Sequence, residues 1–174
     1  MNAEQREAFV VYLVESLAAV GWLGKTHVQK AIYFAQEAGG ADLGFRYLIH
    51  HYGPYSRELD SLVQGLESRD VLTVTAEPDG YGYEVAIGET KLEEPLEAYL
   101  RKSVESIAEC LGGMQTLELE RLSTAFYVRN RLPEADRHVW VREVKNLKPK
   151  FSEEQISQAL DDSEAIAEAI KPSS

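Results

Sequence analysis

The densest group of residues able to bind or to catalyse lies in one short segment, from His50 to Arg57. Imidazoles can bind metal ions or carry protons, but neighbouring residues of a strand point to opposite faces, so His50 and His51 are poorly placed to share one metal ion. No cysteine or suitably spaced carboxylate completes such a site. Tyrosine, histidine and arginine are, however, common residue types at the energetic centres of protein interfaces. We therefore interpret His50, His51, Tyr52, Tyr55 and Arg57 as candidate partner-binding residues, and we expect neither a metal nor another cofactor.

A structural role is the favoured alternative for several of these residues. Tyr52 and Tyr55 would pack the segment onto the core, and Gly53-Pro54 would set the angle at which the next helix begins, with Pro54 in its first turn. Both interpretations stay open at the level of the sequence.

Other chemistries find little support in the sequence. Gly24-Lys25-Thr26 resembles the end of a phosphate-binding loop, but Ala19 stands where that motif requires its first glycine, and the segment follows a helix rather than a strand. We interpret it as a helix start. The single cysteine, Cys110, excludes a disulfide framework and is expected to behave as a small core residue. We predict no catalytic residue; a deep pocket lined by His50 or His51 and a carboxylate would support an enzyme instead.

The elements that must position these residues follow from hydrophobic periodicity and capping signals. Helices are predicted over residues 3–20, from Thr26 (a capping box with Gln29) to Gly39, and from Pro54. A hairpin follows, with strands near 71–75 and 81–88 around a turn at 77–80. This order is typical of a winged helix, so we expect a winged-helix-like part over residues 1–88.

Residues 89–174 are predicted to be helical throughout. Helix starts are expected at Pro95, at Thr116, after Pro133 and at Ser152, where Ser152 and Gln155 form a second capping box. The sequence therefore predicts a mostly helical α+β fold, in which a C-terminal helical part over residues 89–174 packs on the first part as one compact unit.

The charge of the chain and of its predicted helix and hairpin indicates whether the predicted winged helix could bind DNA. The chain carries a formal net charge of −11 and has a pI of about 4.8. Residues 55–70 hold two bases and four acids, and the hairpin over 71–88 holds three acids and no base. Phosphate contacts need cations, so DNA binding in the usual pose is disfavoured.

One basic segment stands apart from this pattern. Residues 121–150 hold eight Lys or Arg and three Asp or Glu, a net charge of +5. On the predicted helix, Arg142 and Lys145 lie opposite the face of Trp140, where they form a second candidate surface for an acidic partner. The alternatives are a solvated face or pairing with the chain's own acids at 93–97. The same segment would serve a DNA-binding regulator, acting through these cations (Arg129, Arg131, Arg137, Arg142 and the nearby lysines).

Three short segments carry a resemblance to a known family: VQKAIYFA at 28–35, HYGPYSREL at 51–59 and KPKFS at 148–152. They resemble the YwgA-like family of uncharacterised bacterial proteins and, more remotely, the Panacea domain, which includes SocA-type antitoxins. Val28 replaces the leucine most common at its position. The resemblance implies binding to a toxin protein, with no catalytic residue to carry over, and it implies an architectural role for the matching residues (Lys30, Tyr33, Tyr52, Gly53 and Pro54).

Together these observations predict a non-enzymatic protein–protein interaction module, antitoxin-like or an adaptor, with a DNA-binding transcriptional regulator as the alternative. The longest apolar run, Phe9 to Val14, is far shorter than the roughly 20 residues that span a membrane. The first residues lack the features of a signal peptide, so we expect a cytoplasmic protein without membrane contact. The sequence is also compatible with a homodimer.

Overall fold

The structure is a computed structural model of the chain and describes residues 1–78, 80, 82–92 and 96–172. Over these residues the chain forms seven helices and two antiparallel two-stranded sheets, β1–β2 and β3–β4. The mostly helical α+β fold predicted from the sequence is confirmed. The elements in chain order are α1 (Ala3–Ala18), α2 (Lys25–Glu37), β1 (Leu48–His50), β2 (Gly53–Tyr55), α3 (Arg57–Ser68), β3 (Leu72–Ala76), β4 (Tyr83–Ile87), α4 (Ala98–Leu111), α5 (Thr116–Arg131), α6 (Arg137–Leu147) and α7 (Glu153–Ala169).

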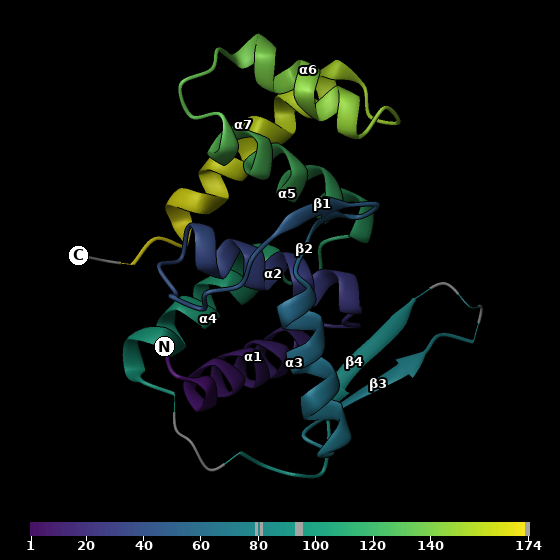
Figure 1. Cartoon of the computed structure of the whole chain (residues 1–174), viewed down its shortest axis with the longest axis vertical. Coiled ribbons are helices and arrows are strands. Elements are labelled where there is room, and N and C mark those ends of the chain that lie inside the picture. Colours follow the sequence, from purple (N-terminus) through teal and green to yellow (C-terminus); the bar gives the residue numbers. More distant parts are fainter. Residues whose placement is uncertain (79, 81, 93–95, 173–174) are drawn as a thin grey trace.

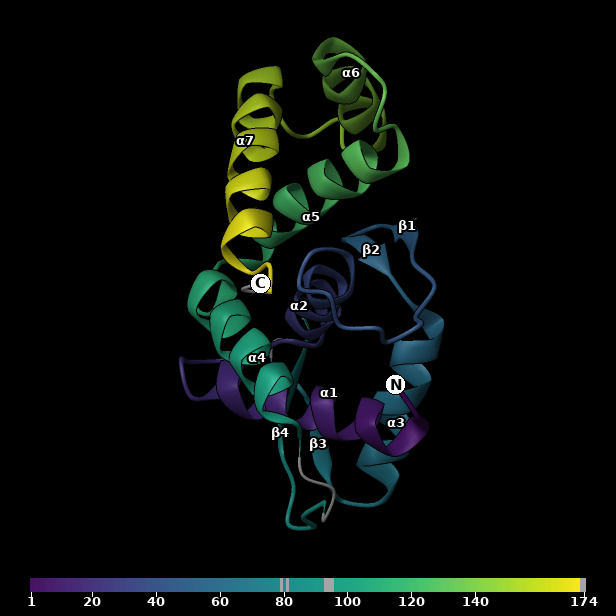
Figure 2. The same ribbon diagram turned by 90° about the vertical axis from the view of Figure 1, so that its left-hand side faces the viewer.

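Helix α2 runs through the middle of the molecule, with α6 at one end and the β3–β4 hairpin at the opposite end (Figures 1 and 2). Residues 27–35 of α2 are buried without interruption, because α4, α5 and β2 all pack against this helix. An aromatic contact joins α2 to α5, because the Phe34 ring of α2 stacks on the Phe126 ring of α5 with their centroids 5.0 Å apart. A helix buried all round must also find partners for its polar side chains, and this requirement shapes the candidate site.

Local signals predicted the last helix correctly. The side chain of Ser152 accepts from the backbone N–H of Gln155, and the Gln155 side chain accepts from the backbone N–H of Ser152. This capping box satisfies two donors that the helix itself leaves free. The residues that helical spacing then places on the inner face of α7 are buried (Ile156, Ala159, Leu160, Ser163 and Ala167).

Two predicted helix starts were wrong, and they share one cause. Helix α2 begins at Lys25 with Gly24 as its N-cap, so Thr26 forms no capping box. Pro54 lies in strand β2 rather than in a first helical turn, and Ser56 caps α3 instead. The side chain of Gln29, assigned to the capping box, bonds the distant backbone of Ser56 and keeps the segment before α3 extended.

The remaining differences concern boundaries. The connection between α2 and α3 contains the β1–β2 hairpin, for which no strands were predicted. The start predicted at Pro95 lies outside the described residues, as does Tyr81 of the predicted second strand, and the described helix begins at Ala98. The predicted order of three helices and a hairpin is present, with β1–β2 added between α2 and α3. The closer comparison with a winged helix stays a prediction.

The β3–β4 hairpin is fastened to the connection between α1 and α2. The backbone N–H of Val85 donates to the carbonyl of Leu23 at 2.8 Å, and Gly24 forms a bridge with Glu84. These contacts place β4 beside the start of α2. None of the helices in the described part of the chain combines the length and apolar character that crossing a bilayer requires.

Candidate functional site

A cleft of about 650 Å³ lies between the β1–β2 turn, the start of α2 and the β3–β4 hairpin. It brings together three of the residues predicted from the sequence, His50, Tyr52 and Tyr55. The other residues that line it come from distant segments (Trp22, Gly24, Lys25, Thr26, Gln29, Lys30, Gly53, Asp60, Gly80, Gly82, Tyr83 and Thr116). We call it the hairpin cleft.

Three aromatic side chains at the hairpin cleft stay open to solvent. Trp22, Tyr52 and Tyr83 are 53%, 56% and 53% exposed, although each presents a large apolar ring. The Trp22 indole N–H donates to Glu77 Oε1 at 2.6 Å, a hydrogen bond that favours one orientation of this ring. Aromatic rings that are held in place and left uncovered can bury a large area at little cost in conformational entropy.

The charges at the hairpin cleft are largely matched within the chain. Lys25 Nζ lies 2.7 Å from Asp60 Oδ1 and 6.0 Å from the centre of the Tyr83 ring. The other oxygen of Asp60 accepts from Gln64 Nε2 at 2.9 Å. Burial, together with Asp60, raises the pKa of the Tyr55 phenol above its ordinary value. The cleft can therefore offer aromatic surface and hydrogen bonds more readily than a free charge.

Two polar side chains of α2 hold β2 from below the cleft. Lys30 Nζ donates to the carbonyl of Pro54 at 2.9 Å. The amide of Gln29 donates to the carbonyl of Ser56 and accepts from its backbone N–H, both at 3.0 Å. Gly53 adopts φ +94, a conformation that favours glycine, where an added Cβ would lie 3.0 Å from Ser123 Oγ. The turn that carries Tyr52 is thus held as a rigid platform.

A buried ion pair holds the other strand of this hairpin. Lys148 Nζ donates to the backbone carbonyls of His50 and His51, and it lies 3.1 Å from Glu120 Oε1. The second oxygen of Glu120 lies 2.8 Å from Lys150 Nζ. The three segments on which the family resemblance rests therefore meet at this cluster, where their lysines bind backbone carbonyls and Glu120.

We expect the buried Lys30 to make stability depend on pH. Burial lowers the pKa of Lys30 from 10.5 to about 7, an effect that Glu120 opposes and Lys148 increases. Between these two values the unfolded chain binds the extra proton, so stability should rise with pH, by at most about 1.4 kcal/mol per unit. Above about pH 10 the trend should reverse, because burial raises the pKa of Tyr33 and Tyr47, which keep their protons only in the folded state.

Urea unfolding between pH 6 and pH 10 measures this dependence. The substitution Lys30→Met keeps the length of the side chain and removes its titration, so its slope between pH 7 and pH 10 should be flatter than that of the wild type. Equal slopes for the two proteins would show that Lys30 does not titrate in this range.

The two residues of the second predicted surface, Arg142 and Lys145, lie on α6, at the end of the molecule opposite the β3–β4 hairpin (Figure 1). Lys145 Nζ donates to the carbonyls of Pro149 at 2.9 Å and of Phe151 at 2.6 Å, so its ammonium group is bound to the backbone of the connection between α6 and α7. Arg142 stays exposed beside Glu143. The basic residues of α6 therefore do not continue the surface of the hairpin.

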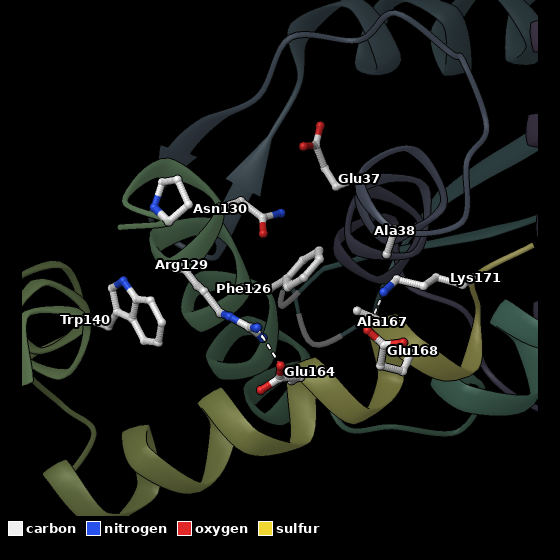
Figure 3. Close-up of a pocket in the computed structure, with 11 residues that line it drawn as sticks. Glu37, Ala38, Phe126, Arg129, Asn130, Trp140, Glu164, Ala167, Glu168 and Lys171 are labelled. Atoms are coloured by element: carbon white, nitrogen blue, oxygen red, sulfur yellow. Dashed lines mark hydrogen bonds and ion pairs between the residues drawn. The ribbon is translucent and has the colours of Figure 1, made fainter. Parts of the chain in front are cut away.

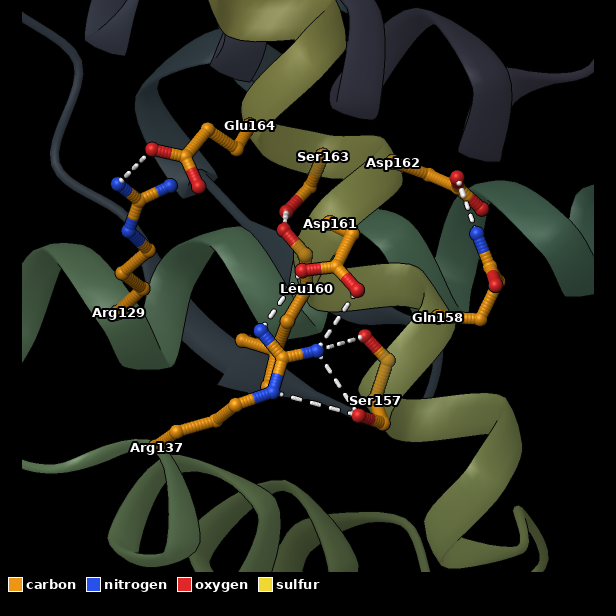
Figure 4. A network of polar contacts seen from close by, with 9 residues as sticks. All are labelled: Arg129, Arg137, Ser157, Gln158, Leu160, Asp161, Asp162, Ser163 and Glu164. Carbon is orange, nitrogen blue, oxygen red and sulfur yellow. Dashed lines mark hydrogen bonds and ion pairs between the residues drawn. The ribbon is translucent and has the colours of Figure 1, made fainter.

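Much of the remaining basic segment is paired across α5, α6 and α7 (Figure 4). Arg137 binds both carboxylate oxygens of Asp161, at 2.7 and 2.8 Å, and also contacts Ser157. Arg129 Nη2 lies 2.5 Å from Glu164 Oε1. These basic residues therefore pair within the chain, but with acids of α7 rather than with the acids predicted at 93–97. Of those, Glu93 and Glu94 lie outside the described residues, and Glu97 is the N-cap residue of α4.

A second cavity of about 490 Å³ lies between α2, α5, α6 and α7 (Figure 3). Its charged lining consists of the pairs Arg129–Glu164 and Lys171–Glu168 and of Glu37, whose carboxylate accepts from Gln36 Nε2 at 3.0 Å. The Arg129 guanidinium lies 5.7 Å from the centre of the Trp140 ring. The hairpin cleft, by contrast, is lined by three exposed aromatic rings.

An enzyme would be supported by a deep pocket lined by His50 or His51 and a carboxylate, and the structure meets this condition only in part. His50 and Asp60 both line the hairpin cleft, but both oxygens of Asp60 are already bound by Lys25 and Gln64. Cys110 is half-buried against the core, and burial raises the pKa of its thiol, which opposes a thiolate nucleophile. Over residues 1–78, 80, 82–92 and 96–172, no group of three or more His, Cys, Asp and Glu side chains is placed to hold a metal ion.

Of the remaining predicted residues, His51 lines, together with His50, a separate cavity of about 460 Å³ beside Lys148, and Arg57 begins α3 outside the lining of the cleft. Sequence reasoning missed Trp22 and Tyr83. A signal for Trp22 existed, because a tryptophan in a short connection between Gly21 and Gly24 has few neighbours to bury it.

No model of a known protein family and no curated protein matches the chain.

Proposed function

We propose that the chain is a non-enzymatic module that binds another polypeptide through the hairpin cleft, as an antitoxin or an adaptor does. The observation that carries this proposal is the convergence of Trp22, Tyr52 and Tyr83, each about half exposed, around one cleft of about 650 Å³. Aromatic residues of this kind dominate the binding energy of protein interfaces when a partner covers them.

The rigid support of the cleft favours the same function. The β1–β2 turn is held through its backbone by Lys30, Lys148 and Gln29, so Tyr52 is presented without a further cost of ordering the loop. Neither Lys25 nor Asp60 is free to act on a substrate, because each neutralises the other. A surface that offers shape and aromatic area with few open charges suits a protein partner.

The distribution of charge favours a protein over DNA. The hairpin over residues 71–88 holds no base, and α3 begins with acids in its first turn, Glu58 and Asp60. Arg129, Arg137 and Lys145 are occupied within the chain. Nonspecific DNA affinity comes from cations that displace counterions from phosphate, and few are open for that contact.

Affinity capture from the native host with three tagged baits tests the proposal. The wild type should retain a stoichiometric polypeptide, Tyr52→Arg should lose it because a charge then blocks the centre of the cleft, and Arg142→Glu should retain it. Both substitutions lie at exposed positions, so circular dichroism should show unchanged folding. Recovery of no stoichiometric polypeptide by the wild type would contradict the proposal, as would equal recovery by wild type and Tyr52→Arg.

A retardation assay with the DNA upstream of the chain's own reading frame separates the alternative function. We expect no retarded band at moderate salt. Binding that weakens steeply as salt rises, and that Arg142→Glu abolishes, would favour the DNA-binding regulator instead.

A further inference from the structure

Strand β3 exposes one edge whose hydrogen-bonding groups are defined by the register of the hairpin. Val74 pairs with Val85, and the N–H of Val85 points away from β3, because it donates to Leu23. In an antiparallel pair, residues alternate between bonding their partner and pointing outward. The bonds from Gly88 to Val71 and from Glu77 to Gly82 fit the same alternation. The N–H and C=O of Val74 and Ala76 therefore point away from β4.

The far half of this edge, from Val74 to Ala76, is open to an incoming strand. In the described part of the chain no strand pairs with the outer side of β3, whereas the outer side of β4 is bridged to Gly24. Thr75 and Ala76 are exposed, and Val74 is half-buried. Residues 71–76 contain no charge and no proline, the features with which proteins commonly block an edge strand.

The charges around the edge select its occupant. Glu84 lies opposite Thr75 in β4, Asp70 precedes the hairpin, and residues 71–88 hold no Lys or Arg, whereas Glu77 Oε1 already accepts from the Trp22 indole N–H. A second copy of the chain would bring the same acidic hairpin and a net charge of −11 against this surface. A basic segment would instead be attracted, because charge of opposite sign steers and aligns a partner.

We propose that the outer edge of β3 binds an extended, basic segment of another polypeptide, which adds to the hairpin as a third strand. Main-chain hydrogen bonds to Val74 and Ala76 supply the register, and the flanking acids supply the preference for Lys and Arg. This surface is distinct from the hairpin cleft, which lies on the β4 side.

Hydrogen exchange of single backbone amides, followed by NMR, tests the proposal with a defined probe. The probe is a capped hexapeptide of alternating lysine and valine, and its control replaces each lysine with glutamate. The lysine peptide should slow exchange of the Val74 and Ala76 amides at least tenfold. The amides of Thr73 and Thr75, already bonded to β4, should change little.

Two variants keep the outcome interpretable. Ala76→Pro removes an outward donor and no bond to β4, so it should weaken binding of the lysine peptide at least tenfold. Tyr52→Ala alters only the hairpin cleft and should bind the peptide as the wild type does. Three results would each overturn the proposal: equal binding of the glutamate peptide, no protection of Val74 and Ala76, and protection that rises with protein concentration without peptide, which would assign the edge to a second copy.

Discussion

Replacing Glu120 with glutamine is expected to lower the free energy of unfolding by about 3–5 kcal/mol, the cost of leaving a buried charge without its partner. The Glu120 side chain is 1% exposed and lies between Lys148 and Lys150. Lys148 is itself buried, and Glu120 also offsets part of the cost of burying Lys30. Chemical denaturation followed by circular dichroism measures the loss.

Glu164→Gln is the matched control for this substitution. Glu164 also pairs with an arginine, Arg129, but the pair lies at the surface, where such contacts contribute at most about 1 kcal/mol. If Glu120→Gln and Glu164→Gln lowered stability equally, the buried cluster would not be what holds the β1–β2 hairpin. A smaller loss at pH 10 than at pH 6 would further tie the effect to Lys30.

Removing two aromatic rings from the hairpin cleft is expected to weaken partner binding at least a hundredfold. Truncation of a central interface residue typically costs about 2 kcal/mol or more, and Trp22 and Tyr52 are the type of residue for which such losses are found. The double variant Trp22→Ala, Tyr52→Ala should fold normally, because both side chains are more than half exposed. Titration calorimetry with the polypeptide captured by the wild type measures the affinity.

Tyr99→Ala serves as the control for aromatic area lost elsewhere. Tyr99 lies on α4 and is 60% exposed, comparable to the rings of the cleft. Its removal should leave the affinity within a factor of two. Equal losses for the control and the double variant would mean that the partner binds no particular aromatic surface.

The parts of the fold that the sequence predicted are those that local contacts determine. The start of α7 rests on a capping box within four residues, and its buried stripe follows from helical spacing. The prediction that a helix begins at Pro54 was wrong for the opposite reason. The local preference of Pro54 for a first helical turn is overridden by hydrogen bonds from Gln29 and Lys30, more than twenty residues earlier in the chain. Long-range hydrogen bonds of this kind leave no periodic pattern.

The candidate site divides in the same way. His50, Tyr52 and Tyr55 are close in sequence, so their composition alone marked the segment. Trp22 and Tyr83 join them only because β4 is bridged to the connection before α2, a contact that neither segment encodes by itself. For the basic segment over residues 121–150, counting charges revealed the excess of cations, but it could not predict that several of them pair with the acids of α7.

The chain's two tryptophans permit the most direct measurement of whether the hairpin cleft is the binding surface. Trp22 lies at the cleft, and Trp140 lies on α6 in the lining of the second cavity. Their two indole N–H resonances, assigned with Trp22→Phe and Trp140→Phe, can be followed while the captured partner is added. We predict that the Trp22 signal shifts or broadens and the Trp140 signal does not. A shift of Trp140 with Trp22 unchanged would contradict the account and place binding at the α5–α7 end.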